Sequence, residues 1–247
     1  MNETLSLLMN HRSIRQFASD PIGEDKLHAI VAAGQMASSS SNVQAYSVIA
    51  VTEPGLKRRL AELAGNQAYV EQCPAFLVWC ADLHRLHYCA ELHAPGEATF
   101  EDSAENLLVA TIDAALAAQN AAVAAESLGL GIVYIGGIRN RIAEVSELLG
   151  LPDRVYPAFG MCVGVPAQEP MLRPRLPLEA VLHRNRYDAG KTAGQVERYD
   201  ETMSAYLRER TGGRQDTPWS KQMADRLAKP TRMHMKPFLE EKGFLRQ

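Results

Sequence analysis

A cluster of basic and hydroxyl side chains near the N-terminus has the residue types of an anion site. His11, Arg12, Ser13 and Arg15 lie within five consecutive residues, directly after a short predicted helix. Arginine presents paired N–H donors that match the oxygens of a phosphate group, so this segment could clamp a phosphate. Clusters of surface charge are also often simply solvated, and an exposed basic turn is the alternative interpretation.

A second basic segment, Arg173–Pro174–Arg175, is stiffened by proline. Pro174 and Pro177 hold the chain extended, so the two guanidinium groups would lose little conformational freedom on binding an anion. A basic linker is the alternative interpretation.

Two uncharged segments could contact a flat ligand. The run Ser38–Asn42 ends a predicted helix, and its hydroxyl and amide groups could surround a heterocycle or a phosphate, although such runs are more commonly plain loops. Gly136–Gly137 follows a predicted strand, where the absence of a side chain would let a ring approach the backbone. A tight turn is the alternative interpretation. The glycines in this region do not have the GxGxxG spacing of a dinucleotide fold.

Four potential metal ligands, His84, His87, Cys89 and His93, fall within ten residues. No second ligand pair follows at the spacing of a zinc finger, and a catalytic zinc usually takes ligands from several elements. The spacing therefore argues against a metal site. The chain also lacks the GxSxG, P-loop and HExxH motifs, so no side chain is expected to act as a nucleophile or metal ligand.

These segments are connected by alternating helices and strands, which predicts an α/β or α+β fold. Apolar residues at helical spacing predict helices over 4–10, after Pro21, from Pro54 to Gly65, over 141–149 and over 195–210. Apolar runs predict strands over 46–51, 75–80, 132–135 and 156–165. No linker interrupts the pattern, so we expect a single domain over 1–247 with a C-terminal helical excursion over about 190–247.

The longest periodic segment, 102–128, contains nine alanines between Ala110 and Ala125 and no proline or glycine up to its end. A helix that is small or apolar nearly all round is buried, and small side chains permit a close approach by another helix. We expect a central helix that also lies at a subunit interface.

Composition narrows the class of protein further. The chain has 247 residues, 46% of them hydrophobic, and a net charge of −3, which gives no basic field for nucleic acid. No secretory signal is apparent, and no run reaches the roughly 18 apolar residues of a membrane-spanning helix. The four cysteines show no paired spacing. We therefore expect a cytoplasmic protein with reduced thiols and with neither nucleic acid nor membrane as a partner.

Five motifs, taken in order, resemble the FMN-dependent nitroreductase and flavin reductase superfamily. They are HRSIRQF at the N-terminus, SSSSNVQ near position 40, GNQAYV at 65–70, ESLGLGIVYIGGIRN at 126–140 and RPRLP at 173–177. The resemblance is closest to the branch of oxygen-insensitive NADPH nitroreductases and NADPH–FMN oxidoreductases, and it covers essentially the whole chain.

The resemblance implies a homodimer of α+β subunits, each with a mixed central sheet wrapped by helices. It implies FMN sites at the dimer interface, each built from both subunits. The residues that match FMN-binding positions are His11, Arg12, Ser13, Arg15, Ser39, Gln67, Tyr134, Ile135, Gly136, Gly137, Arg173 and Arg175. The residues that match positions for NADPH or the acceptor substrate are Ser40, Ser41, Glu105, Arg208, Arg210 and Arg214.

The implied activity is transfer of a hydride from NADPH, with NADH possible, to FMN and then of two electrons to a nitroaromatic, a quinone or a related small acceptor. Flavin reduction for a partner enzyme is the alternative activity, and a non-enzymatic flavin carrier is disfavoured because every flavin-side motif is present. Three positions depart from the pattern. Arg173 replaces a common lysine, Asn42 replaces an aromatic or apolar residue, and Glu209 stands where an arginine is expected.

Overall fold

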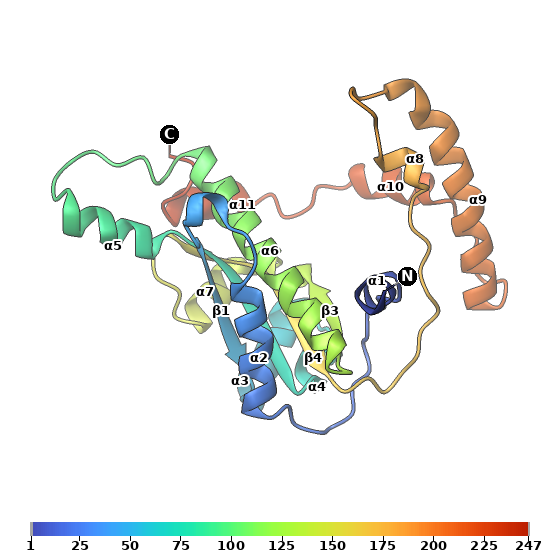
Figure 1. Ribbon diagram of the computed structural model, residues 1–247, viewed down its shortest axis with the longest axis horizontal. Coiled ribbons are helices and arrows are strands. Elements are labelled where there is room, and N and C mark those ends of the chain that lie inside the picture. Colours follow the sequence, from blue (N-terminus) through green and yellow to red (C-terminus); the bar gives the residue numbers. More distant parts are fainter. Residues whose placement is uncertain (1, 247) are drawn as a thin grey trace. The chain divides into compact units, whose positions relative to one another are not determined.

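The computed structural model describes residues 2–246 of the chain (Figure 1). The chain forms two compact units, of which the first contains residues 1–170 and 232–247 and the second contains residues 171–231. The predicted C-terminal excursion of about 190–247 thus corresponds to a unit that begins earlier and ends before the C-terminal helix. That the whole chain is a single domain stays a prediction.

A four-stranded sheet is the centre of the first unit, with strand order β1-β2-β4-β3. The strands are β1 (Tyr46–Val51), β2 (Ala75–Asp82), β3 (Gly131–Ile135) and β4 (Val155–Gly164). All three strand pairs are antiparallel. The resemblance implies a mixed sheet, and within residues 2–246 the parallel component is a bridge between Ser13 and Ile132. Every residue of β2 is buried, as its uninterrupted apolar sequence predicts.

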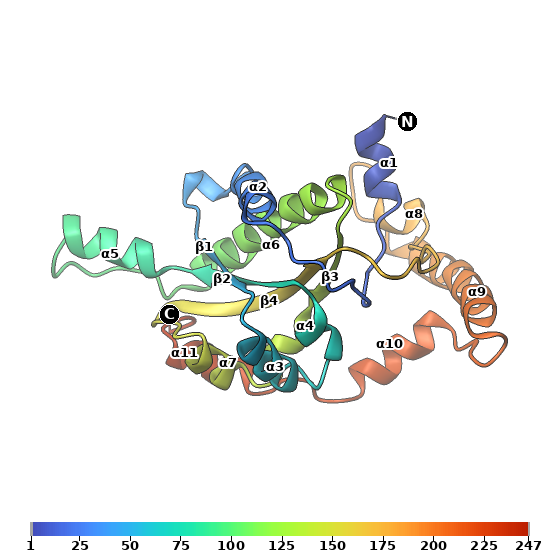
Figure 2. The ribbon, with the colours of Figure 1, turned by 90° about the horizontal axis from the view of Figure 1, so that it is seen from below.

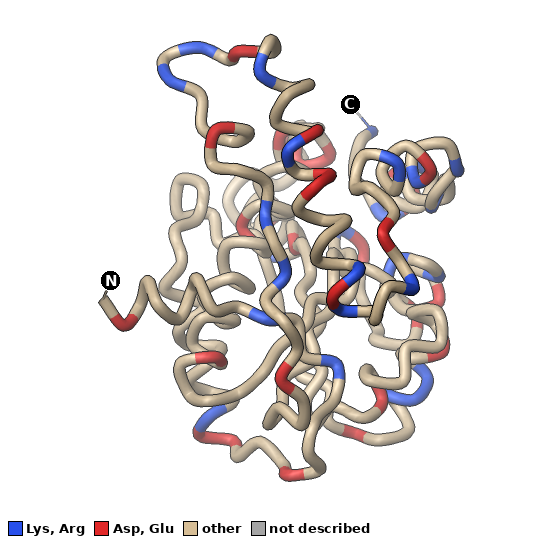
Figure 3. The backbone as a smooth tube through the Cα atoms, turned by 90° about the vertical axis from the view of Figure 1, so that its right-hand side faces the viewer, with Lys and Arg blue, Asp and Glu red and all other residues tan. Residues whose placement is uncertain are grey.

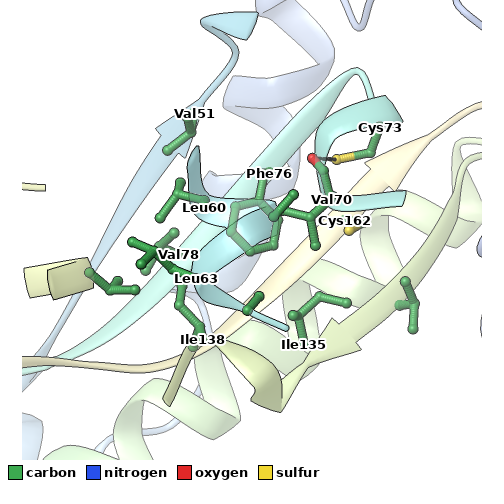
Figure 4. Packing of buried hydrophobic residues seen from close by; sticks show 14 of the residues in the cluster. Val51, Leu60, Leu63, Val70, Cys73, Phe76, Val78, Ile135, Ile138 and Cys162 are labelled. Carbon is green, nitrogen blue, oxygen red and sulfur yellow. Dashed lines mark hydrogen bonds between the residues drawn. The ribbon is translucent and has the colours of Figure 1, made fainter. Parts of the chain in front are cut away.

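Helices cover both faces of this sheet (Figure 2). The helices α2 (Glu24–Gln35) and α6 (Ala104–Ser127) cover one face, where Leu77 and Trp79 of β2 point. The other face is covered by α3 (Pro54–Leu63), α4 (Ala68–Gln72) and α7 (Ile142–Leu148). Phe76 and Val78 of β2 pack there, with Leu60, Leu63 and Ile138 (Figure 4). The alternation of β2 side chains thus divides the core into two layers.

The long helix α6 packs on α2 through small residues. A Cβ added at Gly34 of α2 would lie 3.0 Å from the carbonyl oxygen of Ala117, so glycine is needed for this close approach. The alanines that face the sheet are buried, whereas Leu108, Ile112 and Leu116 on another face are 56%, 53% and 43% exposed. The prediction of a buried central helix is confirmed, and one of its apolar stripes stays open.

By length and composition alone α6 could cross a membrane, contrary to the expectation from the sequence. The core helix of a soluble protein has the same composition, and the alanine face of α6 packs on the sheet. Packing therefore explains the alanine face of α6, whereas the stripe of Leu108, Ile112 and Leu116 is exposed.

Smaller elements complete the first unit. They are α1 (Glu3–Met9), η1 (Ser40–Asn42), α5 (His84–His93), η2 (Gly136–Arg139) and α11 (Met235–Glu241). The last of these follows the second unit in sequence and returns to the sheet of the first. Phe238 and Phe244 are buried beside Tyr156 of β4, and the Arg154 N–H donates to the carbonyl of Lys242 at 2.7 Å.

The second unit consists of helices only. It contains α8 (Leu178–Val181), η3 (Ala189–Lys191), α9 (Thr192–Thr211) and α10 (Trp219–Leu227). Tyr199, Met203, Tyr206 and Leu207 form the buried stripe of α9, and Trp219 of α10 packs against it. The stripe is the one that the sequence predicts for this helix.

Candidate functional site

The basic segment 11–15 lies along the start of β3. The Ile14 N–H donates to the carbonyl of Ile132 at 2.9 Å, and Ser13 pairs with Ile132 in the parallel bridge. The Ile14 side chain is buried against Gly131, where an added Cβ would lie 2.5 Å from Ile14 Cγ1. A glycine at 131 therefore lets Ile14 fix the segment, while Arg15 beside it stays exposed.

A cavity of about 270 Å³ opens beside this segment. Arg12, Ile14, Glu126 and Gly131 line it, together with the stretch 166–170. The Nε of Arg12 is buried and has no hydrogen-bond partner among residues 2–246. A buried guanidinium N–H without an acceptor costs about 1–3 kcal/mol, so the site favours a ligand that brings anionic oxygens.

His11 belongs to the same site through a side-chain contact that the sequence did not indicate. Its Nδ1 lies 2.6 Å from Oε1 of Glu126, near the C-terminal end of α6, and both side chains are largely buried. Glu126 lines the cavity together with Arg12 and Glu169, and His11 provides the Glu126 carboxylate with a partner there.

The segment after β3 is shaped by glycine. A Cβ at Gly137 would collide with Nε2 of Gln67 and with the carbonyl oxygen of Ala64. Gln67 is fixed there, because its Nε2 donates to Ala64 O at 2.6 Å and its Oε1 accepts from the hydroxyl of Tyr69. The amide of Gln67 is therefore held against η2, as expected if both contact one ligand.

β3 is an edge strand, and part of its outer edge carries no further strand among residues 2–246. The carbonyl of Ile132 points outward to Ile14. Because backbone groups alternate in direction along a strand, the N–H and C=O of Tyr134 point to the same outer edge. These polar groups of the backbone are available to a ligand between the basic segment and Gly136.

The side chain of Tyr134 does not face Gln67. Its ring packs edge-on against Phe159 with centroids 5.5 Å apart, and its hydroxyl donates to Oε1 of Gln119 on α6 at 3.4 Å. Burial is the main cause that raises its pKa well above the ordinary value, and the nearby carboxylate of Glu126 adds to it. Tyr134 and Gln67 thus lie on opposite faces of the sheet, and along the outer edge of β3 it is the backbone of Tyr134 that is accessible.

The serine loop is held in an unusual backbone conformation. Ser41, Asn42 and Gln44 have φ values of 47°, 58° and 53°, a region that non-glycine residues seldom adopt. Asp113 of α6 accepts the Ser40 N–H at 3.0 Å and the Ala45 N–H at 3.1 Å. This carboxylate, only 1% exposed, anchors both ends of the strained loop to α6.

Asp113 is not among the residues predicted from the sequence. It is the one charged residue between Ala110 and Ala125, and a charge in an otherwise apolar stretch was the available indication. Ser39 precedes η1 and is half-buried, whereas Ser40 and Ser41 are exposed. Glu105 lies exposed in the first turn of α6.

The remaining predicted residues belong to the second unit. Arg173 and Arg175 are exposed on an extended segment, where the hydroxyl of Tyr199 donates to the carbonyl of Pro174 at 3.0 Å. Arg208 and Arg210 occupy the last turn of α9. Arg214 follows Gly212 and Gly213, whose φ values of 61° and 82° end the helix. The guanidinium of Arg210 lies 5.6 Å from the ring of Tyr206, and Nε of Arg214 donates to Thr211 O at 2.9 Å.

The histidine-rich segment forms α5. His87 pairs with Glu101 at 2.7 Å, and Glu101 also pairs with Arg154 at 3.0 Å. Within residues 2–246 no group of three or more His, Cys, Asp and Glu side chains is arranged to hold a metal ion.

Two family profiles match most of this chain. Residues 8–165 match the profile described as nitroreductase family, and residues 173–247 match its C-terminal domain. The chain belongs to the nitroreductase family. Among nitroreductase relatives, the FMN reductase (NADPH) of Bacillus subtilis is 45% identical over 246 residues, which is 99% of each chain. The oxygen-insensitive NADPH nitroreductase of Salmonella typhimurium is 42% identical over 99% of each chain.

The nitroreductase fold is also the one found among solved structures. The structure of B. megaterium NfrA1 superposes with a TM-score of 0.97 at 47% identity, covering 99% of this chain and 100% of the other. The family and the α+β fold that the five motifs predict are thereby confirmed.

Proposed function

We propose that this chain is an FMN-dependent oxidoreductase that takes a hydride from NADPH and passes two electrons to nitroaromatics, quinones or related acceptors. The observation that carries the proposal is the full-length similarity to relatives named as NADPH-dependent FMN reductase and NADPH nitroreductase. The same two names support the alternative, a flavin reductase that supplies reduced FMN to a partner enzyme.

The residues of the first unit fit FMN. The buried, unpartnered Nε of Arg12 and the neighbouring Ser13 and Arg15 suit the phosphate. The open edge of β3 leads from there to Gly136, four residues beyond Ile132 and roughly 13 Å away at about 3.3 Å per residue. A ligand with a phosphate at one end and a flat ring at the other matches this layout.

The ring end would rest on backbone and amide groups. The glycines at 136 and 137 remove side chains from the approach, and Gln67 would donate to or accept from the ring edge. In the proposal Ser39 lies beside the ring, Ser40, Ser41 and Glu105 lie on the substrate side, and Arg173 with Arg175 provides a second phosphate clamp. His11 completes the first clamp.

When bound, FMN supplies the ring that accepts and donates the hydride, so the chain needs no nucleophile of its own. The chain's part is to bind and orient. N–H donors near the ring edge, such as those of Gln67 and the Gly136–Gly137 segment, would stabilise negative charge that develops there. Solvent supplies protons to the acceptor.

Anaerobic bleaching and steady-state kinetics test the proposed function. The purified protein is expected to be yellow and to lose its colour when NADPH is added under argon. Rates with NADPH and NADH against nitrofurazone, a quinone and free FMN then separate the two activities. The nitroreductase proposal requires turnover of nitrofurazone or quinone without added FMN, and activity with free FMN alone would favour the flavin reductase. A yellow protein that NADPH does not bleach would make it a passive carrier.

We further propose that NADPH is preferred over NADH because Arg208, Arg210 and Arg214 surround its 2′-phosphate. Gly212 and Gly213 would let the segment from Arg208 to Arg214, here called the Arg208–Arg214 loop, close and open. Arg214→Ala is expected to raise the KM for NADPH several-fold and to leave kcat and the KM for NADH nearly unchanged. The reason is that the 2′-phosphate, remote from the transferred hydride, binds equally in the ground and transition states.

Arg226→Ala, which removes a basic residue of α10, is the matched control and should change neither KM. Equal losses with both nucleotides in Arg214→Ala would instead assign Arg214 to the fold or to FMN. A preference of the unmutated protein for NADH would refute the loop assignment.

The protein is proposed to act as a cytoplasmic homodimer. The exposed stripe of Leu108, Ile112 and Leu116 on α6 is more apolar than a surface helix normally leaves in water. The four cysteines are free thiols, as expected in a reducing compartment.

Ile112→Glu tests the dimer. A charge in the centre of the stripe is expected to shift the protein from dimer to monomer at micromolar concentration, because an unpaired carboxylate would have to be buried. Sedimentation velocity measures the change. Ala32→Glu, at an exposed position of α2, is the control and should remain dimeric. An unmutated protein that sediments as an FMN-loaded, active monomer would contradict the proposal.

A further inference from the structure

The second unit contains a cavity of about 170 Å³ that the proposed flavin site does not use. Its lining comes from α8, η3, α9, the first residue of α10 and the segments before and after α8, which contribute Leu176, His183, Tyr187 and Asp188. Leu176, Ala180 and Val196 give it apolar walls, and the indole of Trp219 gives it a flat one. An apolar cavity of about 150 Å³ takes up a single aromatic ring, so by volume this one has room for a ring system of one or two rings.

One wall of the cavity carries a polar atom without a partner. Oε1 of Gln195 is buried and accepts no hydrogen bond from residues 2–246. A buried acceptor in this condition costs about 1–3 kcal/mol, and a ligand with an N–H donor would remove the cost. His183, Tyr187, Asp188 and Thr192 add further polar groups to the lining. The apolar walls and the unpartnered Gln195 acceptor together favour a planar heterocycle that bears an amino or amide N–H.

The rim of the cavity is basic apart from Asp188, whose Oδ1 accepts the Gly190 N–H at 3.0 Å. Figure 3 shows the Lys and Arg positions in blue along the backbone. The loop between α8 and η3 carries Arg184 and Arg186, and Lys191 lines the cavity itself. None of these three side chains has a hydrogen bond or ion pair that the structure shows within residues 2–246. The first turn of α9 adds its N–H groups, since it has no acidic residue and no side-chain cap. An anionic group next to the heterocycle would therefore be favoured.

We propose that this cavity is a second nucleotide site, which binds the heterocycle of a nucleoside monophosphate against Trp219 and its phosphate on the basic rim. The N–H donor comes from the amino group of adenine or the carboxamide of nicotinamide, both of which meet Gln195 Oε1 with the same chemistry. The site is distinct from the proposed Arg208–Arg214 loop. That loop lies at the other end of α9, whose 20 residues span about 30 Å.

Calorimetric titration of the FMN-loaded, full-length protein tests the proposal with three probes. These are AMP, nicotinamide mononucleotide and adenosine. AMP or nicotinamide mononucleotide is expected to bind, and whichever binds more tightly identifies the source of the heterocycle. Adenosine is expected to bind more weakly than AMP, because it lacks the phosphate for the rim.

Variants locate the binding. Gln195→Leu is expected to raise the Kd of the bound probe at least about tenfold, since the ligand N–H then faces a methyl group. Lys191→Ala should weaken the binding of AMP but not that of adenosine. Lys221→Ala on α10 is its control and should change neither. Trp219→Phe provides a second reading if Gln195→Leu folds poorly, because only Trp219 and the core Trp79 contribute tryptophan fluorescence. Any quenching of tryptophan fluorescence by the bound probe must then be lost in Trp219→Phe.

Three results would overturn the site. The first is no binding of AMP or nicotinamide mononucleotide at millimolar concentration. The second is binding that Arg214→Ala abolishes and Gln195→Leu leaves unchanged, which would assign it to the other loop. The third is a change in Trp219 fluorescence that follows protein concentration without any added probe. This would show that a second copy of the chain fills the cavity.

Discussion

Arg12→Ala is expected to raise the Kd for FMN by about 10- to 100-fold and to leave the Kd for riboflavin nearly unchanged. A charge-assisted hydrogen bond of the kind that Arg12 would make to a phosphate contributes about 1.5–3 kcal/mol, and each 1.4 kcal/mol is a factor of ten. Riboflavin lacks the phosphate and so reports on every other contact. Fluorescence titration of flavin-free protein with the two ligands measures both constants.

Two further variants test the same basic segment. Arg15→Ala should also weaken FMN binding, since Arg15 lies on the same segment and is exposed. Arg12→Lys keeps the charge but loses the paired donors, so its Kd should fall between those of the unmutated protein and Arg12→Ala. An Arg12→Ala protein that keeps its full FMN through dialysis would show that the cavity at β3 holds something other than the phosphate.

The second large effect concerns Asp113. Asp113→Ala is expected to lower the free energy of unfolding by about 1–3 kcal/mol from the buried Ala45 N–H alone, which loses its acceptor. The serine loop should also relax, because its positive φ angles depend on this anchor. Urea unfolding measures the first effect, and faster hydrogen exchange of Ser40 and Ala45 measures the second.

Asp20→Ala is the control for the Asp113 variant, since Asp20 is exposed and outside the loop. The free energy of unfolding of Asp113→Asn should lie between those of Asp113→Ala and Asp20→Ala. The amide oxygen can still accept one N–H, while the amide NH₂ group opposes the other N–H. Unchanged exchange rates in Asp113→Ala would show that the loop holds its own conformation, and Asp113 would then be a stabilising residue only.

The sequence predicted the elements that are defined by burial. The β2 run and the alanine stretch of α6 are apolar because the sheet and α2 cover them, and their bounds could be read within a few residues. The short helices α4, α5, α10 and α11 were not predicted. In α5 every residue is at least partly exposed, so no apolar stripe marks it, and its histidines resemble ligands although they pair with carboxylates.

The site was predictable only in part. The basic cluster and the Gly136–Gly137 turn stand out by residue type, and the resemblance supplied their roles. The side-chain contact of His11 with Glu126 joins positions 115 residues apart, and no local pattern encodes such a partnership. The same holds for the contact of Ile14 with Gly131, where the glycine matters because of a distant side chain.

The return of α11 to the first unit has a consequence for how the protein is made. Chains leave the ribosome N-terminus first, at about 5–20 residues per second. All four strands have emerged when Gly164 appears, but Phe238 and Phe244, which cover Tyr156, are synthesised only after the 61 residues of the second unit. Phe244 follows Gly164 by 80 residues. For roughly 4–16 s at that rate the nascent sheet has an uncovered apolar end, so the first unit closes its core only when translation is nearly complete.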